Sequence, residues 1–142
     1  MNVTSAAAAS AVTFVWLGMV LAISFLEAPL KFRAPGVTIP LGLGIGRLVF
    51  RALNAVETVW AVVVVAAVAA GGAPAAVMAL TASAAALLLV QLAVVRPRLN
   101  RRSDRVLAGE ELPRSRSHLW YVALEVLKAG TLVALGVRLL AV

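Results

Sequence analysis

Four long apolar segments constrain this sequence more than any other feature. They cover residues 8–28, 47–70, 74–95 and 118–140. An α-helix needs about 20 apolar residues to cross about 30 Å of hydrocarbon, and each segment reaches that length. We therefore predict an all-α fold, an integral membrane antiparallel four-helix bundle that occupies residues 1–142 as a single domain.

The link between the second and third segments and the composition agree with this prediction. Only residues 71–74 separate these two segments, and so short a link forces the two helices to run antiparallel. Soluble domains are about a quarter charged. In this chain 13% of the residues are charged and 63% are hydrophobic. Because so little polar surface cannot solvate a globule of this size, lipid must contact much of the outside.

Basic side chains gather in the connectors on one side of the predicted bundle. The formal net charge is +7, and the linker 96–117 is rich in arginine. Its arginines are Arg96, Arg98, Arg101, Arg102, Arg105, Arg114 and Arg116. Short loops rich in Lys and Arg stay in the cytoplasm, so we predict that this linker lies beside anionic lipid headgroups and that both chain termini lie outside. Basic residues beside apolar spans do not form the water-facing patch that nucleic acid needs, and we expect no nucleic-acid partner.

The composition and the aromatic residues complete the predicted placement. A high content of Ala, Val and Arg is typical of a bacterium with a GC-rich genome, so we expect a multi-pass protein of the bacterial plasma membrane. Trp120 and Tyr121 are expected in the aromatic belt at the cytoplasmic end of the fourth span. Trp16 and Trp60 lie deeper and are expected to be packing residues.

Ionisable side chains inside the predicted spans are the main indication of a site. A charge near the bilayer centre costs about 2.5 to 3.5 kcal/mol, so such side chains turn inward and are paired. At a rise of about 1.5 Å per residue, Lys128 lies about 15 Å into the fourth span and needs a partner. Glu125 lies three residues back on the same helix face, and Glu57 is available across the bundle.

All four spans deliver polar groups to the cytoplasmic half, whereas the outer half is almost entirely Ala, Val and Leu. This asymmetry predicts a ligand-binding pocket that opens to the cytoplasm. The charged floor of this pocket is predicted to be Glu57, Glu125 and Lys128. Its lining is predicted to be Asn54, Gln91 and His118, and its mouth Glu27, Arg47 and Arg51.

Three interpretations of these residues stay open at this point. Glu57, Glu125 and Lys128 could form a buried ion pair that fixes helix register and does nothing else. They could instead bind a small ligand, an ion or a lipid headgroup, or carry protons, in a transporter-like protein. The polar face could also dock a partner, so that the chain is an accessory or assembly subunit of a larger membrane complex. Because four spans offer few walls for a path, a homodimer is a further expectation.

Enzymatic and metal chemistry has little support in the sequence. The absence of cysteine removes disulfides, thiolate ligands and thiol nucleophiles. With His118 as the single histidine, bis-histidine haem within one chain is excluded, and the paired Glu-x-x-His spacing of di-iron bundles is absent. No Ser or Thr lies beside a histidine and an acid. We therefore expect no catalytic residue, no metal and no cofactor.

Two segments of the chain resemble one another. Residues 50–57 read F-R-A-L-N-A-V-E and residues 121–128 read Y-V-A-L-E-V-L-K, so that an aromatic residue, Ala and Leu coincide in register. One explanation is a pair of related hairpins about a pseudo-two-fold axis along the membrane normal, which often places a site between the halves. The other explanation is chance matching over eight residues.

The order of elements resembles a family of small four-span membrane proteins. The similar features are a first span ending in L-E-A-P-L-K-F, a loop into R-L-V-F-R-A-L, a third span ending in R-P-R-L, and a fourth span opening with H-L-W-Y. That family includes bacterial proteins with a domain of unknown function and a eukaryotic tetraspan linked to platinum-drug resistance. The resemblance implies a helical bundle and a membrane location, and it implies no catalytic residue.

Overall fold

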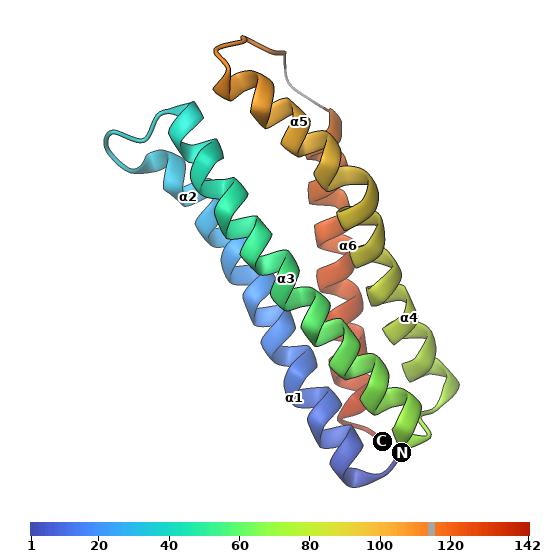
Figure 1. The fold of residues 1–142 in the computed structure, drawn as a ribbon. Helices are drawn as coiled ribbons and strands as arrows, with labels where there is room; N and C mark the ends of the chain where they lie inside the picture. The colour runs from blue at the N-terminus through green and yellow to red at the C-terminus, as the bar shows by residue number, and fades with distance from the viewer. Residues whose placement is uncertain (114–115) are drawn as a thin grey trace.

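The computed structural model describes residues 1–113 and 116–142, and within these residues it contains helices and no β-strand (Figure 1). The predicted all-α class is therefore confirmed. The helices are α1 (Val3–Val20), α2 (Ala28–Leu30), α3 (Ile39–Gly71), α4 (Ala75–Val90), α5 (Arg96–Leu107) and α6 (Arg116–Leu139).

Three helical rods in the described part of the chain are long and apolar enough to cross a membrane. They are Val3–Arg33, Ile39–Gly71 and Ala75–Leu107. The first rod joins α1 to α2 and ends in a 3₁₀ turn at Lys31–Arg33, and the third joins α4 to α5. Length and apolarity of this kind indicate a membrane location.

Four long helical elements lie side by side along one axis. Helix α1 packs against α3 and α6, and α4 packs against α6 and α3. Both chain termini lie at the end opposite to the connection between α5 and α6 (Figure 1). The polar connectors that follow the first and third rods therefore lie at one end of the molecule. The short link between α3 and α4 lies at the other end, beside the chain termini (Figure 1).

Two π-helical segments explain why the first and third rods are longer than the sequence suggested. Leu21–Glu27 precedes Pro29, and Gln91–Val95 precedes Pro97. A proline lacks an N–H and its ring clashes with the carbonyl four residues earlier, which normally breaks a helix. The wider π turn changes the hydrogen-bond register ahead of each proline, so the helix continues past it.

The predicted helix boundaries are corrected accordingly. The first span was predicted to end at residue 28, but its helix continues to Arg33. The third was predicted to end at residue 95, but the chain stays helical to Leu107, so much of the linker 96–117 is helix α5. The second helix begins at Ile39, before the predicted residue 47. Arg114, one of the predicted linker arginines, lies outside the described residues.

The helix ends are fixed by local hydrogen bonds and by glycine. Asn2 caps α1 by accepting the N–H of Ser5 at 2.8 Å, and Thr38 caps α3 by accepting the N–H of Leu41 at 3.3 Å. Helix α3 is capped after Gly71 by Gly72, whose φ of 67° lies in the left-handed region that glycine adopts without strain.

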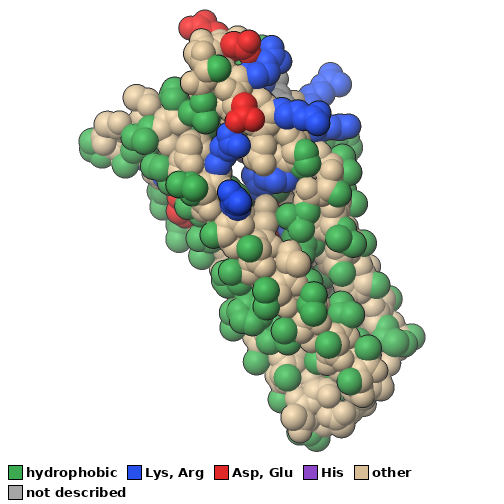
Figure 2. Space-filling model, in the orientation of Figure 1, with side chains coloured by type: hydrophobic (Ala, Val, Ile, Leu, Met, Phe, Trp, Pro, Cys, Tyr) green, Lys and Arg blue, Asp and Glu red, His purple; other side chains and the backbone are tan. Residues whose placement is uncertain are grey.

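Buried apolar side chains form two clusters along the axis. One, near the chain termini, includes Val64, Val77 and Leu135, and the other surrounds Trp16 and Leu132. Charged side chains gather at the opposite end, over α5 and the first turns of α3, while the visible face of the remaining length carries hydrophobic and other uncharged side chains (Figure 2).

Candidate functional site

The amine of Lys128 is the centre of a fully buried polar cluster. Its Nζ lies 2.5 Å from Oε2 of Glu57 and 2.7 Å from Oε1 of Glu125, and it donates a hydrogen bond of 2.8 Å to Oε1 of Gln91. The exposed fraction of each of these four residues is 0 or 1%. An ammonium group has three protons, and three oxygen atoms from Glu57, Glu125 and Gln91 surround this one.

Trp16 adds a fifth member to this cluster, which we call the charge cluster: Trp16, Glu57, Gln91, Glu125 and Lys128. The indole Nε1 of Trp16 donates to Oε2 of Glu57 at 2.8 Å, and the amide of Gln91 donates to Oε2 of Glu125 at 3.4 Å. The cluster therefore joins α1, α3, α6 and the π-helical segment after α4.

The charge cluster lies deep within the long helices. Glu57 is about 20 Å along α3 from its end at Gly71, at about 1.5 Å per residue. Oε1 of Glu57 is buried and has no hydrogen-bond partner among the described residues. Two carboxyl groups face one ammonium group, so the cluster contains more acid than a simple ion pair needs.

A cavity of about 470 Å³ lies at the polar end of the molecule, and Glu125 forms part of its wall. The cavity lies between the end of the first rod, the first turns of α3, helix α5 and the start of α6. Its wall residues are Ser24, Phe25, Ala28, Pro29, Lys31, Phe32, Gly42, Leu43, Gly46, Arg47, Phe50, Arg96, Leu99, Asn100, Ser103, His118, Tyr121, Val122 and Glu125. A volume of this size suits a small organic ligand.

Aromatic rings and one guanidinium group form a compact part of the wall. The rings of Phe50 and Tyr121 meet edge to face, with centroids 5.7 Å apart and planes at 87°. Cζ of Arg96 lies 4.7 Å from the Phe50 centroid and 4.6 Å from the Tyr121 centroid. Cation–π contacts on two rings hold the guanidinium group in place.

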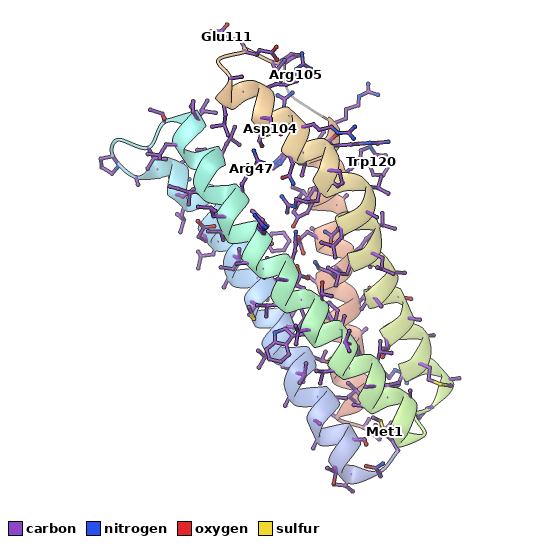
Figure 3. All side chains as sticks on the ribbon, in the orientation of Figure 1. Met1, Arg47, Asp104, Arg105, Glu111 and Trp120 are labelled. Atoms are coloured by element: carbon purple, nitrogen blue, oxygen red, sulfur yellow. The ribbon has the colours of Figure 1, made fainter. Side chains whose placement is uncertain are left out.

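Two ion pairs lie at the rim of the cavity. Arg47 of α3 pairs with Asp104 of α5, and the two side chains reach toward one another across the gap between these helices (Figure 3). Lys31 Nζ lies 3.7 Å from Oε2 of its neighbour Glu27. The first pair links α3 to α5, so it ties the two sides of the cavity together.

Most of the predicted pocket residues lie either in the charge cluster or at the cavity. Glu57, Gln91 and Lys128 belong to the charge cluster, and Glu125 belongs to both the cluster and the cavity wall. At the cavity itself, the sequence-predicted residues are Arg47 and His118, with Glu27 paired to a wall residue at the rim.

Two predicted pocket residues lie elsewhere. Arg51 is exposed on α3 and is not among the residues that line the cavity. Asn54 is buried, with an exposed fraction of 9%, but it is not part of the cavity wall. The two residues were predicted because they share one face of the helix with Arg47, and only part of that face lines the cavity.

Three residues of the site were assigned other roles by the sequence. Tyr121 was expected in an aromatic belt, yet it is 6% exposed and lines the cavity, whereas its neighbour Trp120 is 65% exposed. Trp16 was expected only to pack, and it also donates to the cluster. Arg96 was assigned to the cytoplasmic linker beside lipid headgroups, but it lies on the cavity wall.

The two similar segments of the sequence meet at this site. Phe50 and Tyr121, which correspond in the sequence alignment, are in ring contact, and Glu57 and Lys128, which also correspond, form an ion pair. Equivalent positions of two repeats meet in this way when the repeats are related by a two-fold axis.

Comparisons with known proteins give no relative. No protein-family model, no curated protein and no solved structure matches this chain. Among the described residues, no group of three or more His, Cys, Asp or Glu side chains could hold a metal ion. The charge cluster and the cavity are therefore the features of this chain that bear on its function.

Proposed function

We propose that this chain is a small multi-pass protein of the bacterial plasma membrane whose cavity binds a small ligand at the cytoplasmic side. In this proposal α6 is a fourth span, and the four spans form an antiparallel bundle with both termini outside. Support comes from the three apolar rods and from the arginine-rich α5, which positive-inside insertion would retain in the cytoplasm.

The observation that carries the ligand-binding proposal is the position of Glu125. One carboxylate both lines the cavity and binds the buried amine of Lys128 at 2.7 Å. A ligand that contacts Glu125 would therefore alter the charge balance of a cluster that joins all four long helices. Such a link between an open cavity and a deep charged centre is what a transporter-like protein needs.

The acid content of the cluster favours this proposal over a purely structural ion pair. One carboxylate opposite Lys128 would suffice to fix the register of α3 and α6. The chain instead buries a second carboxylate, Glu125, and leaves Oε1 of Glu57 without a hydrogen bond among the described residues. Buried charge beyond a balanced pair is costly, and a ligand or proton site explains its presence.

The cavity is expected to be open to water from the cytoplasm, and the cysteine-free chain allows a direct test. We expect S103C, on the cavity wall, to react with a membrane-impermeant thiol reagent in inside-out vesicles. The matched control is S83C, whose side chain is exposed on α4 and would face lipid. Lipid does not ionise a thiol, so this control is expected to stay unmodified.

Two results would count against this proposal. Reaction of S103C from the outer face of intact cells would reverse the proposed orientation. Failure of S103C to react from either side would show that a partner subunit or lipid fills the cavity, which would favour the accessory-subunit alternative.

A further inference from the structure

Arg96 differs from the other cations of the cavity wall and from the cation of the charge cluster. Lys31 pairs with Glu27, Arg47 pairs with Asp104, and Lys128 is held by two carboxylates. For the Arg96 guanidinium, the contacts found among the described residues are the faces of Phe50 and Tyr121.

Two of its nitrogens are buried without a partner. Nε and Nη2 of Arg96 are shielded from solvent, and neither donates a hydrogen bond to any described residue. A buried donor without an acceptor costs about 1 to 3 kcal/mol, and a charged donor costs more. The arrangement is therefore incomplete unless something supplies the acceptors.

The geometry of the two nitrogens indicates which acceptor would fit. Nε and Nη2 lie along one edge of the planar guanidinium group, and this edge binds two oxygens of a carboxylate or phosphate side by side. The two rings fix the plane of the group, so little freedom is lost on binding. Ser24, whose buried Oγ also has no partner among the described residues, lies on the same cavity wall and offers a further donor.

We propose that Arg96 is the receptor for the phosphate group of an organic phosphate ester, bound side-on through Nε and Nη2. Apolar wall residues such as Phe25 and Val122 contact the rest of the ligand. The Glu125 carboxylate on the same wall is engaged by Lys128 and Gln91, which reduces its repulsion of the phosphate. This inference rests on the proposed function, since it names the ligand class of the same cavity.

The phosphate could belong to a membrane lipid or to a soluble organic phosphate, and the two sources can be separated. The thermal unfolding midpoint of the purified protein would be measured in an uncharged detergent, titrated with short-chain phosphatidic acid, with glycerol phosphate, or with the matching uncharged diacylglycerol. We expect phosphatidic acid to raise the midpoint and diacylglycerol to leave it unchanged. If glycerol phosphate raises the midpoint as much as phosphatidic acid does, the ligand is a soluble organic phosphate. If phosphatidic acid raises the midpoint and glycerol phosphate does not, the ligand is a lipid headgroup.

Variants of two neighbouring arginines test the role of Arg96. R96Q is expected to weaken phosphate binding about tenfold or more, as loss of a charge-assisted bidentate contact implies. R96K keeps the positive charge but lacks the two parallel donors of the guanidinium group, so it is expected to weaken phosphate binding less than R96Q does. R96K replaces R96Q in the test if R96Q does not fold. The matched control R98Q changes an exposed arginine on the same helix and is expected to bind as the wild type does.

The inference is overturned if no phosphate compound shifts the midpoint, or if R96Q and R96K bind phosphate as tightly as R98Q. Its failure can be told apart from failure of the proposed function. If phosphate has no effect while diacylglycerol slows thiol modification of S103C, the cavity binds a ligand but Arg96 is not an oxyanion receptor. If the cavity is closed to thiol reagents as well, both proposals fail.

Discussion

Replacing Lys128 with methionine is expected to lower the free energy of unfolding by about 3 to 5 kcal/mol, the range found when one partner of a buried ion pair is removed. The side chains have similar lengths, so packing changes little. The variant leaves the carboxyl groups of Glu57 and Glu125 without their shared cation, in a region where both are at most 1% exposed. Chemical or thermal unfolding in detergent, or in lipid nanodiscs, gives the measurement.

A surface ion pair provides the control for this variant. Arg105 lies 2.6 Å from Glu110, but both side chains are at least half exposed. R105Q is therefore expected to change stability by about 1 kcal/mol or less. If K128M were as mild as R105Q, water would reach the charge cluster, and the buried geometry described above would be wrong.

Replacing Trp16 with phenylalanine is expected to lower the free energy of unfolding by about 1 to 3 kcal/mol, the cost of leaving a buried charged acceptor short of a donor. The change keeps an aromatic ring in the core and removes the Nε1 donor from Oε2 of Glu57. Because Oε1 of Glu57 already has no hydrogen-bond partner among the described residues, Lys128 would be left to compensate this carboxylate.

The matched control is W60F on the neighbouring helix. The indole of Trp60 donates to the sulfur of Met19 at 3.3 Å, and a thioether is a weak acceptor. W60F is therefore expected to cost clearly less than W16F. Equal losses from the two variants would mean that ring size, and not the hydrogen bond to Glu57, determines the effect of W16F.

The helical class and the centre of the site could be predicted from the sequence for physical reasons. Long apolar segments have few alternatives to helices in lipid, and a lysine near the midplane requires partners. The rise per residue and the helical period were enough to select Glu125 and Glu57 as the partners of Lys128. Gln91 was selected by depth alone, and it too contacts the amine.

The missed residues depended on information that apolar patterning does not contain. The third apolar segment ends at residue 95, so Arg96 was assigned to a linker, whereas a π turn carries the helix through and places Arg96 on the cavity wall. Tyr121 lies four residues before Glu125 and so shares its helix face. This spacing was the sequence signal that could have placed Tyr121 at the cavity and not in the aromatic belt. Trp16 has no polar neighbour in its own helix, and only tertiary packing places it beside Glu57.

The most direct test of the central claim, that the buried charges serve binding and not stability, is the free energy of unfolding of the triple variant E57Q/E125Q/K128M. This variant removes every charge of the cluster at once and keeps the side-chain sizes. Replacing a complete buried ion pair with neutral residues of similar volume is often neutral or stabilising. We expect the triple variant to be at least as stable as the wild type while K128M alone is strongly destabilised. A triple variant as unstable as K128M would contradict the account, because the charges would then be needed to hold the helices together.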